Sequence, residues 1–148
     1  MPTVTSAISI AAPLEVVYAL ARDIERFPEF MEDVEEVEIL EQTPERQVSR
    51  WVGAIKELHR SVKWTEEDFW DDAAHVCVFR QLEGDFTAYA GRWEFTPEAG
   101  GTRMTMVIDY EYEVPLIGAL IQGLLLKKMQ ANTDAMLAAL KGKAETGV

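Results

Sequence analysis

The sequence is poor in several features that would point to a particular class of protein. Its single cysteine, Cys77, excludes an intramolecular disulfide framework and fits a reducing compartment. Lys and Arg number only 14 against 26 Asp and Glu, which gives a net charge of −12, and no basic run interrupts this excess. Nucleic-acid phosphates and anionic membrane surfaces repel such a chain. We therefore expect no nucleic-acid partner.

Long apolar runs and nucleotide or nucleophile motifs are also missing. The most apolar stretch, 114–126, contains Pro115 and Gln122 and is shorter than the roughly 20 residues that span a bilayer. The segment after Met1 lacks the basic and apolar regions of a signal peptide. Gly-rich phosphate loops and a Gly-x-Ser-x-Gly motif are absent. We expect a cytoplasmic protein with no integral membrane segment.

The 148 residues, 48% of them hydrophobic, fit one domain over 1–148. Alternating residues predict a strand over 3–11, and helical spacing predicts a helix over 14–23 with a short helical piece over 23–27. Further strands are predicted over 34–40, 47–55, 58–66, 75–82, 86–96 and 102–114, followed by a long helix over 116–141. Short turns between them favour an antiparallel meander. The prediction is an α+β domain with a curved, seven-stranded antiparallel sheet covered by the last helix.

Specific segments carry a family resemblance over almost the whole chain. They are Ala12-Pro-Leu-Glu-Val-Val-Tyr-Ala-Leu, Phe27-Pro-Glu-Phe-Met-Glu-Asp-Val, Gly91-Arg-Trp-Glu-Phe, Gly101-Thr-Arg-Met-Thr-Met and Ile108-Asp-Tyr-Glu-Tyr-Glu-Val-Pro-Leu-Ile. In this order they resemble the START and Bet v 1-like (SRPBCC) superfamily and its polyketide cyclase/dehydrase group. Within that group the likeness is nearest to coenzyme Q-binding START-like proteins and ribosome-association toxins. The resemblance implies a helix-grip fold with a ligand cavity.

One segment departs from the coenzyme Q-binding members. After Phe30 the chain reads Met-Glu-Asp-Val-Glu-Glu-Val-Glu, where those members have an aromatic residue and a small polar or Cys-containing segment. This difference argues against a quinone as the ligand.

Strand alternation predicts which side chains face the concave side of the sheet. Met104, Met106, Ile108, Tyr110 and Tyr112 form one such set. The side chains that we predict to contact a ligand are Trp51, Trp64, Phe79, Tyr89, Trp93, Met106 and Tyr110 from the sheet, and Ile121, Leu125 and Met129 from the last helix. In an ordinary small domain these residues would simply fill a core. Four Trp and four Tyr with polar tips, and six adaptable Met, instead favour the lining of a cavity.

Other polar residues give weaker signals. His75 and Cys77 are spaced for one face of a strand, with His59 as a possible third ligand, but no second ligand pair accompanies them, so we predict no metal and no cofactor. Asp109, Glu111 and Glu113 alternate along a strand, and Arg50, Arg60, Arg80 and Arg92 could pair with such carboxylates. A solvated ladder of ion pairs explains them, so no catalytic residue is assigned.

Three functions follow. The leading hypothesis is a carrier or sensor of a lipophilic small molecule, such as a lipid, isoprenoid or polyketide-like compound, held between the sheet and the last helix. The second is a cyclase, aromatase or dehydratase that uses the same cavity. The third is a regulatory interaction module whose acidic surface would face a basic protein. The acidic residues Glu32, Asp33, Glu35, Glu36, Glu38 and Glu41 are expected to form an exposed, mutually repelling face or a docking surface for such a partner. The apolar stretch 114–126 is expected to be a helix start buried under loops, with a homodimer contact or a lipid-entry portal as the alternatives.

Overall fold

The computed structural model describes residues 1–56, 59–113 and 119–146 and contains a seven-stranded antiparallel sheet. The strands are β1 (Thr3–Ile10), β2 (Val34–Gln42), β3 (Arg46–Ile55), β4 (Arg60–Asp71), β5 (Val76–Gly84), β6 (Ala88–Glu98) and β7 (Gly101–Glu111). Their order in the sheet is β1-β7-β6-β5-β4-β3-β2. The predicted meander is therefore confirmed, and the two strands that come first in the chain form its opposite edges.

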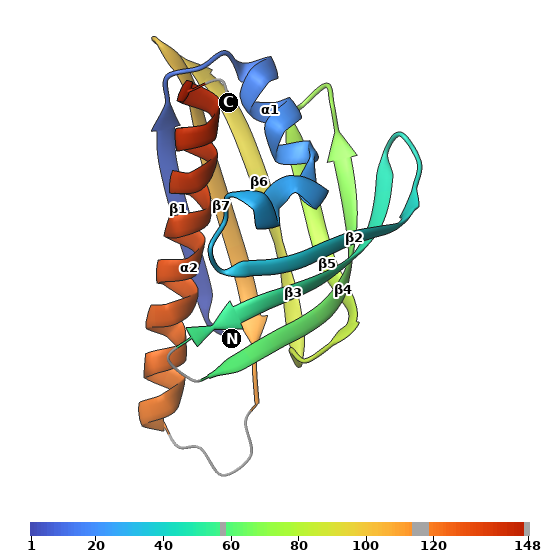
Figure 1. The fold of residues 1–148 in the computed structure, drawn as a ribbon, viewed down its shortest axis with the longest axis vertical. Helices are drawn as coiled ribbons and strands as arrows, with labels where there is room; N and C mark the ends of the chain where they lie inside the picture. The colour runs from blue at the N-terminus through green and yellow to red at the C-terminus, as the bar shows by residue number, and fades with distance from the viewer. Residues whose placement is uncertain (57–58, 114–118, 147–148) are drawn as a thin grey trace.

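The helices lie on the concave side of this sheet. They are α1 (Leu14–Arg22), the 3-10 helix η1 (Ile24–Glu29) and α2 (Ala119–Thr146). Figure 1 shows α2 running lengthwise beside β1 and β7, while β2, β3 and β4 curl across the same side of the molecule. The helix-grip architecture predicted above is thus observed. None of the described helices is long and apolar enough to cross a membrane.

Polar contacts fasten α2 to the edge strand β1. Ser6 donates a hydrogen bond to Asp134 (2.6 Å), and the Gln130 amide and the Lys141 ammonium donate to backbone carbonyls of β1. The apolar side of the helix faces inward, where Leu125, Leu137 and Leu140 are almost fully buried. Helix and sheet therefore enclose one core.

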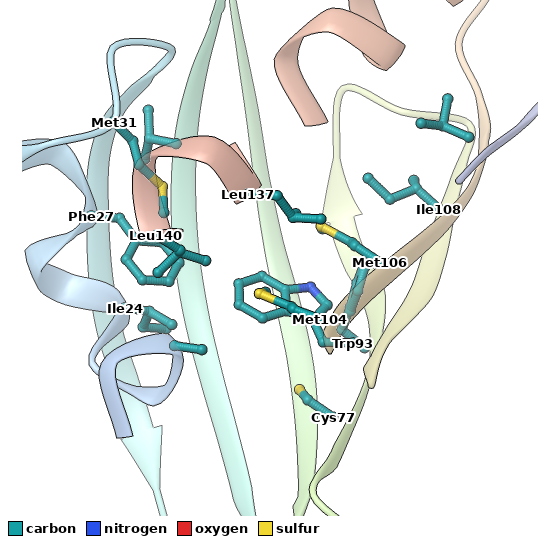
Figure 2. Packing of buried hydrophobic residues seen from close by; sticks show 14 of the residues in the cluster. Ile24, Phe27, Met31, Cys77, Trp93, Met104, Met106, Ile108, Leu137 and Leu140 are labelled. Atoms are coloured by element: carbon teal, nitrogen blue, oxygen red, sulfur yellow. The ribbon is translucent and has the colours of Figure 1, made fainter. Parts of the chain in front are cut away.

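Strand alternation determines which side chains enter that core. Met104, Met106, Ile108, Tyr110 and Tyr112, in and just after β7, are all buried, as the alternation predicts. Figure 2 shows Trp93 of β6 near the centre of the cluster, with Phe27 of η1 on one side and Met106 on the other. Side chains from both edges of the curved sheet and from the helices thus meet in one apolar cluster.

Several element boundaries differ from the predicted ones. The strand predicted over 58–66 is β4, which continues to Asp71, because the charged segment after Trp64 pairs with both β3 and β5. The last helix continues to Thr146, and its predicted start at Leu116 lies outside the described residues. His75 belongs to the turn before β5, with φ of 55°, so it does not share a strand face with Cys77.

Candidate ligand-binding site

A cavity of about 100 Å³ lies between the concave face of the sheet and α2. Strands β3 to β7, the segment before β2 and the middle of α2 supply its walls. Two lining residues, Glu32 and Ala135, are exposed, so the cavity reaches the surface between the start of β2 and the helix. At this rim the Asn132 amide donates a hydrogen bond to the Ala54 carbonyl (3.1 Å) and joins α2 to β3.

The structure brings seven of the ten predicted contact residues together around this cavity. They are Trp51, Trp64, Phe79, Tyr89, Trp93, Met106 and Met129. Of the other three, Tyr110 and Leu125 are buried in the core behind the lining, and Ile121 is half-buried on the first turns of α2. Whether the seven contact a ligand stays a prediction.

Aromatic rings form most of one wall. Trp51 and Trp64, on neighbouring strands, stack with ring centroids 5.9 Å apart and planes 8° apart. Tyr89 lies 5.3 Å from Trp64 and stacks on Phe86 at 4.7 Å. Such surfaces favour flat or apolar groups, because they offer a large contact area that loses little conformational entropy on binding.

A pair of buried carboxyl groups interrupts this apolar wall. Glu66 and Asp68 occupy alternate positions of β4 and therefore point to the same, inner face. The Trp64 indole N–H donates to Glu66 (2.7 Å), and the Ser49 hydroxyl donates to Asp68 (3.3 Å). The Trp51 indole N–H donates in turn to the Ser49 oxygen (2.9 Å). Of the two carboxyls, Glu66 lies in the cavity lining.

The environment of the pair favours retention of a proton. Burial raises the pKa of Glu66 well above its usual range, and the neighbouring Asp68 raises it further through its charge and a shared hydrogen bond. Burial also raises the pKa of Asp68, against the hydrogen bonds from Glu66 and Ser49 that stabilise its ionised form. Two adjacent buried carboxyls do not both ionise readily. At neutral pH the arrangement favours a Glu66 acid that donates to an Asp68 carboxylate.

The carboxylate on the opposite face of β4 has basic neighbours and a lowered pKa. Glu67 points outward and accepts hydrogen bonds from Arg46 (2.7 Å) and Arg80 (3.0 Å) on the two neighbouring strands. These hydrogen bonds lower the pKa of Glu67. Adjacent acidic residues therefore have opposite protonation tendencies, because Glu67 is paired with two arginines, whereas Glu66 and Asp68 are buried without a basic partner among the described residues.

The sequence analysis missed Glu66 and Asp68. The predicted strand ended at Glu66, so Asp68 lay beyond it. The available signal was the alternation of Trp64, Glu66, Asp68 and Trp70, which places two acidic residues between two tryptophans on one strand face.

The acidic and basic residues that the sequence analysis did consider lie elsewhere. Asp109 points outward and accepts a hydrogen bond from Thr3 (2.5 Å). Three of the predicted arginines pair with other carboxylates, Arg50 with Glu38, Arg80 with Glu67 and Arg92 with Glu94, and Arg60 donates to the Tyr112 hydroxyl (3.3 Å). The Arg50–Glu38 and Arg92–Glu94 contacts are the exposed ion pairs expected of a solvated face, whereas Arg80 pairs with the buried Glu67 and Arg60 contacts a tyrosine hydroxyl.

The candidate metal ligands are also separated. The His75 Nε2 atom lies 2.8 Å from the Glu15 carboxylate, and Cys77 is buried in the core. Burial raises the pKa of the Cys77 thiol. Among the described residues, no three His, Cys, Asp or Glu side chains are grouped to hold a metal ion.

The acidic run at the start of β2 divides between two environments. Glu35, Glu36, Glu38 and Glu41 lie outside the cavity, whereas Glu32 and Asp33 reach its lining. Lys56 contacts both of these, at 2.5 Å from Glu32 and 3.9 Å from Asp33. A basic protein partner for the outer part stays a prediction, as does a homodimer contact through 114–126, part of which lies outside the described residues.

The sequence and fold comparisons agree with this architecture. A family model described as "Polyketide cyclase / dehydrase and lipid transport" matches residues 10–137, and the chain belongs to this family. A Streptomyces cyaneus protein provisionally named a polyketide cyclase is 29% identical over 104 residues, which cover 70% of this chain and 68% of that protein.

Solved structures extend the comparison to the fold. TTHA0849 from Thermus thermophilus is 36% identical, with 99% of each chain covered and a TM-score of 0.93. The Zhui aromatase/cyclase from Streptomyces sp. R1128 is 24% identical, with 97% of this chain and 93% of that chain covered and a TM-score of 0.89. A START superfamily protein from Mycobacterium smegmatis is 20% identical, with 99% of each chain covered and a TM-score of 0.81. The predicted START-like fold is therefore confirmed.

Proposed function

We propose that the protein binds a lipophilic small molecule in the cavity between the sheet and α2. The observation that carries this proposal is a cavity walled by Trp51, Trp64, Tyr89 and Trp93. It opens to the surface near Glu32 and Ala135. A folded core normally closes such a space, because each void sacrifices van der Waals contacts. A ligand that fills it gains both those contacts and the burial of its own apolar surface.

The size of the cavity limits what enters it. A volume of about 100 Å³ is of the order of one aromatic ring or a short alkyl chain. Met106, Met129 and Met136 line the space, and their unbranched side chains can change rotamer to admit a larger group. The enclosed part of a ligand is therefore about the size of one ring, and the remainder of a longer molecule extends toward the rim.

Titration with 4-phenylbutanol, which carries one ring and a neutral polar end, tests the proposal. Binding should give a saturable change in tryptophan emission, since two of the four Trp stack in the cavity wall, and a negative ΔCp by calorimetry. Native mass spectrometry of freshly purified protein should in addition detect a retained apolar molecule. Absence of saturation across a panel of single-ring alcohols, lipids and aromatic polyketides would rule out the binding function.

A second candidate function is the elimination of water from a β-hydroxy carbonyl compound. The buried carboxyl pair favours it, because the reaction needs one group that protonates the leaving hydroxyl and one that accepts a proton from the α-carbon. Protonated Glu66 would supply the first proton as the C–O bond breaks and its electron pair goes to oxygen. The carboxylate of the pair would accept the α-proton as the C=C bond forms. The pair would then again hold one proton, and the product would be an enone and water.

Incubation with 4-hydroxy-4-phenylbutan-2-one tests this second function. Turnover would be followed by the ultraviolet absorption of the conjugated product, 4-phenylbut-3-en-2-one. Glu66→Gln should abolish turnover while the binding of 4-phenylbutanol persists. Equal rates for the wild type and Glu66→Gln would exclude the carboxyl pair as the acid and base.

A further inference from the structure

The charged side chains in the cavity lining are all acidic. Among the described residues that line it, Glu32, Asp33 and Glu66 are acidic, and none is Lys, Arg or His. Asp68 adds a second carboxyl directly behind Glu66. A ligand that enters the cavity therefore passes two carboxylates at the rim and meets the carboxyl pair at the inner wall.

Basic residues near this region are already engaged. Lys56 lies at the rim and pairs with Glu32 and Asp33. On the α1 side, Arg22 forms an ion pair with Asp72 (2.7 Å) and lies over the Trp70 ring. Arg46 and Arg80 are on the outer face of the sheet with Glu67.

The groups that face the carboxyl pair from the neighbouring strands are neutral. They include Gln47 and Ser49 of β3, Cys77 and Gln81 of β5 and Tyr89 of β6. Burial raises the pKa of both the Cys77 thiol and the Tyr89 hydroxyl. Any negative charge on the pair is thus surrounded by apolar and neutral polar side chains. A buried charge without a counter-ion is costly, and a ligand of opposite charge would remove that cost.

The aromatic wall suits the same kind of ligand. Trp51, Trp64, Phe86 and Tyr89 line the cavity close to Glu66, and the faces of such rings attract cations. An ammonium group placed here would contact aromatic faces and a carboxyl oxygen together, while its hydrocarbon part would occupy the apolar remainder of the cavity.

We propose that the cavity selects lipophilic amines in their cationic form, with the ammonium group held by Glu66 and Asp68 and flanked by Trp51 and Trp64. This inference rests on the proposed ligand-binding function and specifies its ligand class. Glu32 and Asp33 together with Lys56 leave the rim with a net negative charge, which draws such cations toward the opening.

Three probes of similar length and differing charge test the inference. They are 4-phenylbutylammonium, 4-phenylbutanol and 4-phenylbutyrate, titrated at neutral pH and followed by tryptophan emission and calorimetry. The ammonium should bind about tenfold or more tighter than the alcohol, and the carboxylate should bind most weakly. The Glu66→Gln, Asp68→Asn double variant should lose most of this preference, because the two amides that replace the carboxyls cannot carry a negative charge.

Glu67→Gln is the matched control, because it removes one carboxylate from the same strand but from the outer face. It should retain the full preference for the ammonium probe. Each variant is first compared with the wild type by circular dichroism and thermal melting. The comparison of the three probes on the wild type needs no variant.

The outcomes separate this inference from the proposed function. If ammonium and alcohol bind the wild type equally, or the carboxylate binds best, the cavity binds ligands but does not select amines, and the inference is wrong. Persistence of the preference in a folded double variant would likewise overturn it. If none of the three probes binds, the proposed binding function itself fails.

Discussion

Trp51 and Trp64 stack across β3 and β4, and hydrogen bonds connect each indole N–H to one member of the buried carboxyl pair. Trp64 donates directly to Glu66, whereas Trp51 donates to Ser49, which donates to Asp68. The two rings therefore form an apolar wall of the cavity and also position its acidic groups. A Trp→Phe exchange keeps an aromatic ring in the wall but removes the N–H donor, so it separates the packing role of these residues from their hydrogen bonding.

Trp64→Phe should keep a ring in the wall but remove the donor to Glu66. The hydrogen bond from Trp64 lowers the pKa of Glu66, so its loss should raise that pKa further. Infrared difference spectroscopy of the protonated carboxyl band during a pH titration measures the effect. Trp70→Phe is the control, because the Trp70 indole donates to Gln47 instead. An unchanged Glu66 titration in Trp64→Phe would contradict the assigned hydrogen bond.

The carboxyl pair should make the stability of the free protein fall as the pH rises. The folded-state pKa of Glu66 lies above its ordinary value of 4.5, so between these two values the native state binds more protons than the unfolded chain. The stabilising contribution is complete below about pH 4.5 and is lost as the pH rises through the folded-state pKa. Glu66→Gln should therefore gain stability relative to the wild type as the pH rises from about 5 to about 8.

Urea denaturation at several pH values measures this difference. At about pH 8 the advantage of Glu66→Gln should be about 1 kcal/mol or more, as for other buried charges replaced by neutral groups. Glu67→Gln should behave in the opposite sense. Its carboxylate has a lowered pKa, so it stabilises the protein above the unfolded-state pKa, and the loss caused by the variant should disappear in acid. A pH-independent difference for Glu66→Gln would show that Glu66 titrates normally.

Filling the cavity should block binding without unfolding the protein. Val62 lines the cavity and is buried, so Val62→Phe places a ring in the space that a ligand would occupy. We expect the affinity for 4-phenylbutanol to fall about tenfold or more, at little cost in stability because a void is filled. Val78→Phe makes the same change on the outer face, where Val78 is 50% exposed, and should leave binding unchanged. Equal affinities for both variants would place the ligand elsewhere.

Trp93→Ala should weaken binding for a different reason, the loss of wall area. We expect a loss of more than about 1 kcal/mol in binding free energy. Trp93 also stacks on Phe27, with ring centroids 5.9 Å apart, so the variant should melt at a lower temperature. The titrations should therefore be carried out well below its melting temperature. The exposed Glu36→Ala serves as the control and should bind like the wild type. Unaltered ligand affinity in a folded Trp93→Ala protein would show that Trp93 does not contact the ligand.

Two adjacent residues of α2 test which side of the helix faces the sheet. Leu125 is 1% exposed and Leu126 is 40% exposed. Leu125→Asp buries an unpaired charge and should cost about 3 kcal/mol or more, whereas Leu126→Asp should change the stability by less than about 1 kcal/mol. Chemical denaturation of both variants measures the difference. Equal costs would mean that the inward face of the helix is assigned incorrectly.

The order of the elements was predictable because each one carries its own local pattern. Alternation in β7 identified both the strand and its inner face, and turn residues separated it from β6. The inner side of α2 was harder to identify, because Thr133 lies on it. Its hydroxyl donates to the Met129 carbonyl, and this hydrogen bond makes a polar side chain acceptable in the core.

The polar part of the site was not predictable by the same means. Charged residues usually mark a solvated segment, so the predicted strand ended at Glu66 and left Asp68 outside it. Only pairing with β3 and β5 shows that it continues, with Glu66 and Asp68 inside and Glu67 outside. Whether space remains between side chains depends on packing in three dimensions, and the sequence does not record it.

The position of β1 at the far edge of the sheet has a consequence for how the chain folds as it is synthesised. Thr3 pairs with Asp109 and Ile10 with Thr102. Strand β1 therefore leaves the ribosome long before its partner β7 has been synthesised. Strands β2 to β7 can form successive hairpins in the meantime. Contacts this distant in sequence close slowly, since a long loop must be ordered before they form. We expect the nascent sheet to grow from β2 toward β7 and to bind β1 and α2 last, which would expose its apolar concave face to chaperones until α2 packs against it.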